Sequence, residues 1–189
     1  AKAMCEMNRI PKRFFIDPAN DRQNPWIADD DLVGPQGAAG SAQRREQLNE
    51  IIRSQALCFA YGRAEVVEID ELNIFHASLL AMQRAVRALS VPPQHALVDG
   101  KFAPELECSV TTVIGGDDRE EAIAAASIIA KVKRDSEMMQ LHELYPDYGF
   151  DLHKGYPTKL HLQALHRNGI TEHHRRSFRP VRQVIEQDR

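Results

Sequence analysis

Residues 95–118 read HALVDGKFAPELECSVTTVIGGDD, and this stretch decides the fold because it contains two strand signals, each with an acid at or just past its end. An apolar run over residues 96–98 stops at Asp99, and a β-branched run over residues 109–114 stops two glycines before Asp117. We therefore predict two strands, the first ending at Asp99 and the second followed by Gly115-Gly116 and Asp117 before the next helix.

Helical patterns surround these strands. Apolar residues recur at helical spacing after Ser41, a good N-cap residue, and again over residues 68–89, where Val91-Pro92-Pro93 ends the helix. The run at residues 57–61 predicts one more buried strand. Further helices are predicted over residues 120–144 and near residues 159–167 and 180–187. Strands that alternate with helices indicate an α/β domain.

The length of 189 residues suits one domain with a substantial core. We expect residues 44–150 to form the α/β core and residues 151–189 to form a basic helical segment of the same domain, whereas residues 1–43 are atypical and poor in periodicity. No apolar run reaches the roughly 18 residues of a membrane span, and we see no secretory signal. Three cysteines at unrelated spacings fit reduced thiols, so we expect a cytoplasmic protein without membrane contact.

Charge is distributed unevenly along the chain. The formal net charge is −3, but residues 153–182 hold seven Lys or Arg against one acid, together with five of the eight histidines. A basic face on an otherwise acidic protein is what a binder of nucleic-acid phosphates needs, although a solvated helix surface explains the charge equally well.

Asp99 and Asp117 are the candidate chemical groups. Ligands bind at the carboxyl ends of strands in open α/β sheets, and two carboxylates meeting there suit a hard cation such as Mg²⁺. Taken alone, the two acids have structural explanations as well: Asp99 as a turn residue before Gly100, and Asp117 or Asp118 as a helix N-cap.

From Arg44 onward the chain resembles the bacterial ribonuclease HII (type 2 ribonuclease H) family, through short motifs in the family's order and spacing. These are GRAE (62–65), IDELNI (69–74), AMQRAV (81–86), VDG (98–100), GD (116–117), AASIIAKV (125–132), RD (134–135), HKGYPT (153–158) and HRRSF (174–178). The resemblance implies a ribonuclease H-like fold with a mixed central sheet flanked by helices and a helical C-terminal segment.

The resemblance also implies a function and its residues. Asp99 and Asp117 match family acids that hold Mn²⁺ or Mg²⁺ for cutting RNA in RNA–DNA hybrids and ribonucleotides in duplex DNA. Tyr156 matches a tyrosine that packs against sugar where RNA meets DNA. We assign the phosphate contacts to Lys154, Arg175 and Arg176. Asp118 is the alternative to Asp117 as a metal ligand, because the doubled aspartate also fits an alignment shifted by one residue. We expect a monomer.

One family motif is missing from this sequence. The family's N-terminal strand ends in Asp-Glu-X-Gly-Arg-Gly and supplies the first carboxylate pair, but residues 1–43 contain no such motif. Two accounts remain open. The N-terminal residues are truncated or frame-shifted relative to the native protein, or the chain is a divergent form with half a metal site. We favour the first account, because the rest of the chain shows no decay.

Two other functions stay open. A non-catalytic hybrid-binding protein would keep the basic segment without the full acidic site, and a DNA nuclease or transposase of related fold would share the carboxylate chemistry. Neither His173 nor His174 predicts a metal site, because no cysteine or third histidine stands at ligand spacing. We expect an exposed or helix-capping pair there.

Overall fold

The computed structural model describes residues 41–187, and its sheet is the parallel pair β1 (His95–Asp99) and β2 (Ser109–Val113). The register places Asp99 opposite Val113. Ala96 and Val98 turn one face of β1 into the core. Both strands are therefore as predicted. Within the described residues, the sheet consists of this parallel pair.

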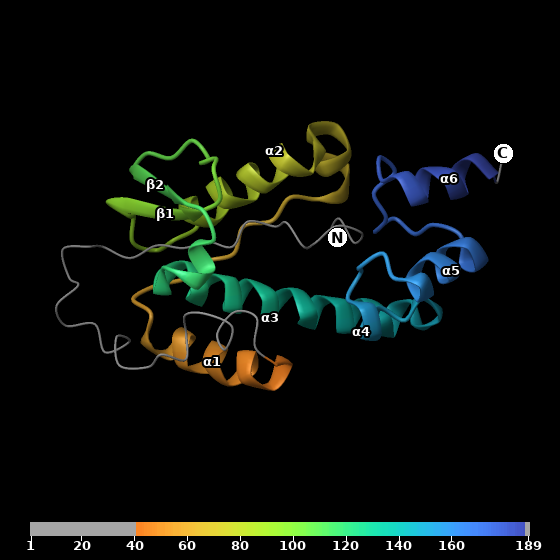
Figure 1. Ribbon diagram of the computed structural model, residues 1–189, viewed down its shortest axis with the longest axis horizontal. Helices are drawn as coiled ribbons and strands as arrows, with labels where there is room; N and C mark the ends of the chain where they lie inside the picture. Colours follow the sequence, from red (N-terminus) through yellow and green to blue (C-terminus); the bar gives the residue numbers. More distant parts are fainter. Residues whose placement is uncertain (1–40, 188–189) are drawn as a thin grey trace. The chain divides into compact units, whose positions relative to one another are not determined.

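Helices make up most of the remaining described chain (Figure 1). The α-helices are α1 (Ala42–Gln55), α2 (Val66–Arg87), α3 (Glu121–Leu144), α4 (Phe150–His153), α5 (Lys159–Asn168) and α6 (Arg179–Gln187), and the 3-10 helices are η4 (Gly116–Asp118) and η5 (Pro146–Tyr148). The five longer helices confirm the predictions from periodicity. The short elements η4, η5 and α4 were not predicted, because a single turn has too few residues to produce a periodic pattern. No described helix is long and apolar enough to cross a bilayer.

The described residues fall into two compact units. The sheet unit comprises residues 41–63 and 79–133, and the C-terminal unit comprises residues 64–78 and 134–187. Each is described by itself. The expected division at residue 150 stays a prediction.

The core of the sheet unit joins α1 to the first half of α3 (Figure 1). Leu48 and Ile52 of α1 pack against Ile128 and Ile129 of α3, and all four are nearly inaccessible. Ser41 begins α1 as predicted, because its side chain accepts a hydrogen bond from the main-chain N–H of Arg44. Apolar burial of this kind is what holds an amphipathic helix in place.

The C-terminal unit has two apolar clusters. One joins the end of α3 to η5 and α4, and it contains Met138, Leu141, Tyr148 and Phe150. The other joins α5 to α6 through Leu165, Val181 and Val184. Because these clusters fix η5, α4 and α5, they also fix the turn at residues 153–158 that carries the predicted sugar contact.

The strand predicted over residues 57–61 is wrong. That segment has no regular secondary structure, and Leu57 is 86% exposed. Its neighbour Gly62 instead runs against α2, where a Cβ would lie 1.8 Å from the carbonyl oxygen of Ala81. An apolar run becomes a strand only when another strand hydrogen-bonds to it, and the described sheet consists of β1 and β2.

The helix predicted over residues 68–89 is interrupted at Asn73. Its φ of 67° and ψ of 165° break the helix, and its Oδ1 accepts hydrogen bonds from the N–H groups of Phe75 and His76. Asparagine tolerates positive φ and caps a following helix well, so α2 is two helical pieces joined at Asn73.

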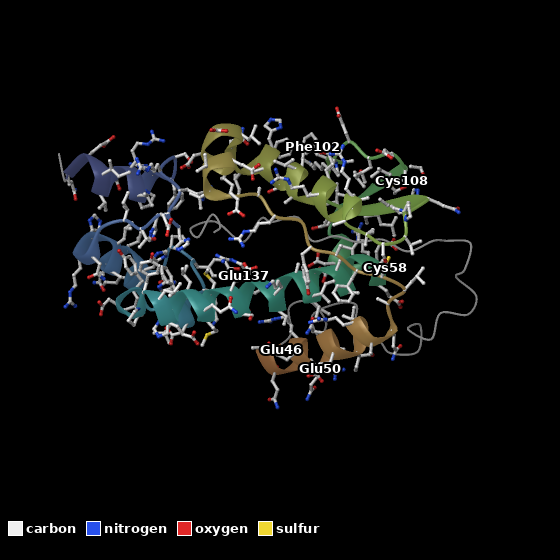
Figure 2. All side chains as sticks on the ribbon, turned by 180° about the vertical axis from the view of Figure 1, so that it is seen from behind. Glu46, Glu50, Cys58, Phe102, Cys108 and Glu137 are labelled. Carbon is white, nitrogen blue, oxygen red and sulfur yellow. The ribbon has the colours of Figure 1, made fainter. Side chains whose placement is uncertain are left out.

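Residues 1–40 lie outside the described residues, and so does every prediction that concerns them. Of the three cysteines, Cys58 and Cys108 are described; both are free thiols on separate segments of the sheet unit (Figure 2). This agrees with the expected reduced state of these two cysteines.

Candidate active site

The Asp99 carboxylate lies at the carboxyl end of β1, the edge at which parallel strands present ligands. Its Oδ1 accepts a hydrogen bond from the main-chain N–H of Gly116 at 2.9 Å. Gly116 is buried against Ile123 of α3, where a Cβ would come 2.4 Å from the isoleucine Cδ1. A glycine at this position lets the turn after β2 approach α3 and reach Asp99 without displacing the Ile123 side chain.

Asp117 follows Gly116 directly and is half-buried within η4, whereas Asp118 is exposed. The N-cap of η4 is Gly115, and α3 begins at Glu121, so neither aspartate occupies a helix N-cap position. The structural explanation of these acids as caps is therefore wrong. The hydrogen bond to Asp99 brings the two predicted acids to neighbouring positions at one edge of the sheet.

This pair suits a divalent metal ion but does not complete a cage. Carboxylate oxygens are the ligands that Mg²⁺ and Mn²⁺ prefer, and Mg²⁺ commonly keeps several waters beside one or two carboxylates. Within residues 41–187 no three His, Cys, Asp or Glu side chains are grouped to hold a metal. The donor set therefore fits such an ion with two protein carboxylates, water and substrate phosphate.

The predicted sugar contact stands on a tight turn in the C-terminal unit. Lys154 ends α4 with a φ of 50°, and Gly155 follows with a φ of 85°. The main-chain N–H of Tyr156 donates to the His153 carbonyl, and the Tyr156 carbonyl accepts from the N–H of Thr158. A lysine at positive φ persists only where the surrounding structure imposes it, so this turn is held firmly. The Lys154 ammonium lies 2.9 Å from the sulfur of Met139.

The segment with Arg175 and Arg176 is held by Asp70 of α2. The Asp70 carboxylate accepts hydrogen bonds from the N–H of Arg176 and from both the N–H and the hydroxyl of Ser177. Although partial burial opposes it, these bonds and the nearby Arg175 charge lower the pKa of Asp70. Arg176 is exposed, whereas Arg175 is 4% exposed, with its guanidinium over the ring of Phe178. Asp70 therefore fixes the backbone that carries the exposed Arg176.

A cluster of buried histidines joins the turn that carries Tyr156 to the segment that carries Arg175 and Arg176. Nε2 of His161 lies 3.3 Å from Nε2 of His174, and Nδ1 of His161 lies 3.0 Å from the Tyr156 carbonyl oxygen. The ring of His153 stacks on that of His161, with centroids 4.3 Å apart. The expectation that His174 is exposed or caps a helix is therefore wrong, because it is 2% exposed and faces this cluster.

Burial keeps these histidines neutral. It lowers the pKa of His161 to about 4, with help from the nearby His153. Burial, together with His161 and His173, lowers the pKa of His174 to about 3. Desolvation likewise lowers the pKa of His153. At neutral pH the cluster is therefore uncharged and contributes nothing to the basic surface.

The structure thus gathers the predicted residues in two sets, one in each unit. Asp99 and Asp117 lie at one edge of the sheet in the sheet unit, where the residue before Asp117 binds Asp99, whereas Lys154, Tyr156, Arg175 and Arg176 lie in the C-terminal unit. Sequence reasoning missed Asp70 and the histidine cluster. The gathering of five histidines within residues 153–182 was a signal for the cluster, but it was interpreted as part of the basic surface.

Comparison with known proteins gives consistent matches. The ribonuclease HII family profile matches residues 40–181. The chain is 53% identical over 147 residues to a ribonuclease HII of Marinomonas sp., covering 77% of this chain and 74% of that protein. It is 55% identical over 146 residues to one from Nitrosococcus oceani, covering 77% of this chain and 73% of that protein.

A solved structure has the same fold. The ribonuclease H2 of Pyrococcus horikoshii OT3 aligns with a TM-score of 0.68 at 24% identity, covering 91% of this chain and 87% of that one. This similarity confirms the predicted ribonuclease H-like α/β fold.

Proposed function

The chain belongs to the ribonuclease HII family, and on that premise we propose that it hydrolyses the RNA strand of RNA–DNA hybrids and cuts at single ribonucleotides in duplex DNA. It is a metal-dependent endoribonuclease of the ribonuclease H type. The observation that carries the proposal is the hydrogen bond from the Gly116 N–H to Asp99, which holds the residue before Asp117 at the carboxyl edge of the parallel strands.

Asp99 and Asp117 would hold the metal, Mn²⁺ or Mg²⁺. When bound, such an ion activates water and stabilises charge on the oxygens around the scissile phosphate. The protein's own part is to orient the two carboxylates. Gly116 N–H fixes one oxygen of Asp99, and no other residue in the range 41–187 hydrogen-bonds to that carboxylate.

The C-terminal unit would recognise the nucleic acid. We assign Tyr156 to the sugar at the ribonucleotide, because a 2′-hydroxyl is what distinguishes RNA from DNA. We assign Lys154 and the exposed Arg176 to backbone phosphates, which position a duplex without reading its sequence. The phosphate contact predicted for Arg175 stays a prediction; its buried guanidinium suits a supporting position beneath that surface.

Cleavage of a labelled DNA duplex with one embedded ribonucleotide tests the proposal. With Mn²⁺ or Mg²⁺ present, we expect the wild-type chain to cut beside the ribonucleotide and to leave an all-DNA duplex intact. The Asp99→Asn variant keeps the oxygen that accepts from Gly116 but loses the charge that holds the metal, so cutting should disappear while the fold remains. Equal cutting of both duplexes would instead indicate a DNA nuclease.

A second candidate is a hybrid-binding protein without catalysis. It is favoured by the absence of any three-membered group of metal-binding side chains within residues 41–187 and by the missing first carboxylate pair. Binding that weakens steeply with salt, without cleavage in either metal, would support this candidate.

Monomeric state and cytoplasmic location complete the proposal. The first is tested by light scattering during gel filtration of the full chain. The second is tested by fractionating cells that express the tagged protein.

A further inference from the structure

We propose that His161 and His174 form a chain of neutral imidazoles that positions Tyr156, so that the preference for a ribonucleotide depends on two buried histidines with no access to the substrate. The inference rests on the sugar contact proposed for Tyr156. It assigns a positioning role to His161 and His174. Neither can touch the substrate, because His161 is 0% exposed and His174 is 2% exposed.

The chain begins at Thr171. Nδ1 of His174 accepts a hydrogen bond from the main-chain N–H of Thr171 at 3.0 Å, so this nitrogen carries no proton. The neutral ring must then carry its proton on Nε2. That N–H lies 3.3 Å from Nε2 of His161 and donates to it.

The second link ends at Tyr156. Because Nε2 of His161 accepts from His174, the proton of a neutral His161 is on Nδ1. This N–H lies 3.0 Å from the main-chain oxygen of Tyr156, which can only accept. Each ring therefore has one tautomer that satisfies both of its nitrogens, and the hydrogen bonds run in one direction from Thr171 to Tyr156.

His153 supports the chain from the side. Its Nδ1 accepts from the N–H of Gly155, and its Nε2–H donates to the carbonyl of Tyr148. Its ring stacks on His161 at an interplanar angle of 10°, and the fully buried Phe150 packs edge-on against both rings. The imidazoles are thus fixed in position by packing as well as by hydrogen bonds, as a positioning network requires.

The chain also connects Tyr156 to the arginine segment. His174 directly precedes Arg175, and Asp70 holds the next two residues through Arg176 N–H and Ser177. A shift of either motif would stretch the 3.3 Å contact between the histidines. The proposed sugar contact and the exposed Arg176 are therefore placed relative to each other through His161 and His174.

Nuclear magnetic resonance tests the tautomers without any substrate. The ¹⁵N chemical shifts of the ring nitrogens distinguish a protonated from a bare nitrogen. At pH 7.5 we expect His161 to be protonated on Nδ1 alone and His174 on Nε2 alone. The opposite tautomer on either ring, or a charged ring, would overturn the chain.

Matched variants test the positioning. His161→Leu removes both ring nitrogens at similar volume, whereas His161→Asn keeps a side-chain N–H near the position of Nδ1. The measured quantity is the ratio of affinities for a duplex with one ribonucleotide and an all-DNA duplex, with no divalent metal added so that binding is measured without cleavage. We expect His161→Leu to lower this ratio by roughly 2- to 10-fold, the range of one hydrogen bond, and His161→Asn to restore most of it.

The Tyr156→Ala background separates positioning from general damage. In that background His161→Leu should produce no further loss of preference, because its effect acts through Tyr156. An additional loss, or an unchanged ratio in the single variant, contradicts the inference while leaving the sugar contact intact. If the wild-type chain shows no preference and Tyr156→Ala changes nothing, the sugar contact itself fails. Should His161→Leu not fold, the tautomer measurement and the His161→Asn variant still decide the question.

Discussion

The two candidate sets of residues are held in place differently. In the sheet unit, Asp99 ends β1 and Asp117 lies in η4 after β2, and one hydrogen bond from the Gly116 N–H to Asp99 joins the two segments. In the C-terminal unit, several contacts hold the candidate residues: Asp70 binds the Arg176 segment from more than 100 residues away, and His161 of α5 contacts both the Tyr156 carbonyl and His174. We propose that the first set binds a metal. The second set is held by buried neutral histidines and by the partly exposed Asp70 carboxylate.

The Asp99 carboxylate is thus held by one hydrogen bond, whereas the placement of Tyr156 and Arg176 depends on a network of several hydrogen bonds. A variant at the sheet edge should therefore affect cleavage most. A variant in the histidine or Asp70 network should affect stability and substrate preference together.

The largest effect is expected at Asp117. Asp117→Asn should lower the cleavage rate by on the order of 100-fold or more, because it removes half of the described carboxylate charge. The exposed Asp118→Asn serves as the matched control and should change the rate little. Single-turnover cleavage of the one-ribonucleotide duplex measures both. A large loss at Asp118 with normal activity at Asp117 would reverse the assignment of the metal ligand.

Acid pH should weaken the histidine network next. Well above pH 6.5 the histidines are neutral in both the folded and the unfolded state, so they add no pH dependence there. As the pH falls below 6.5, these histidines become protonated in the unfolded chain. In the folded chain they stay neutral until the pH approaches their lowered pKa values, about 4 for His161 and about 3 for His174. The unfolded state is therefore stabilised relative to the folded state. At pH 4.5 each contributes a loss on the order of 2 kcal/mol.

Urea denaturation at pH 7.5 and pH 4.5 measures this loss. His161→Leu removes one of the titrating groups, so its free energy of unfolding should change less between the two pH values than that of the wild type. Parallel pH dependence in the two proteins would mean that His161 is not held neutral by the fold.

A smaller loss of stability is expected at Asp70. Asp70→Ala removes the acceptor of three hydrogen bonds at a partly exposed site and should cost about 1.5 kcal/mol. Hybrid binding should weaken with it, because the segment carrying Arg176 is released. Glu71→Gln, at the exposed neighbouring carboxylate, is the control for a general charge effect. Equal effects of the two variants on unfolding and binding would remove Asp70 from the network.

The smallest effect is expected at Asn73. Asn73→Ala places alanine at positive φ and removes the acceptor for two N–H groups, so we expect a cost of about 1 kcal/mol. Asn73→Gly keeps the favourable φ and should cost less. Thermal unfolding of both variants checks the order, and a more stable alanine variant would show that the break in α2 is not imposed by this residue.

Local patterns were sufficient to predict β1, β2 and the longer helices. Each of these is specified by residues close in sequence, such as the apolar run that ends at Asp99 or the cap at Ser41. The strand at residues 57–61 was mispredicted because pairing depends on a neighbour that an apolar run does not specify. The break at Asn73 was missed because helical periodicity continues on both sides of it.

The network around Tyr156 was not predictable in this way. His161 and His174 are polar residue types that the fold buries, and burial is acceptable only because each nitrogen finds a partner. Those partners are fixed by tertiary packing on Phe150 and by the turn at Lys154, which sequence spacing does not reveal. The resemblance to the family identified Tyr156 but not what holds it.

The central claim is that Asp99 and Asp117 together hold a divalent metal, and Mn²⁺ binding followed by electron paramagnetic resonance tests it most directly. The titration uses the full chain, first alone and then with an uncleavable hybrid duplex, and compares the wild type with an Asp99→Asn/Asp117→Asn double variant. The account predicts weak Mn²⁺ binding by the wild type that strengthens with the duplex and is lost in the folded double variant. Undiminished Mn²⁺ binding by that variant would contradict it.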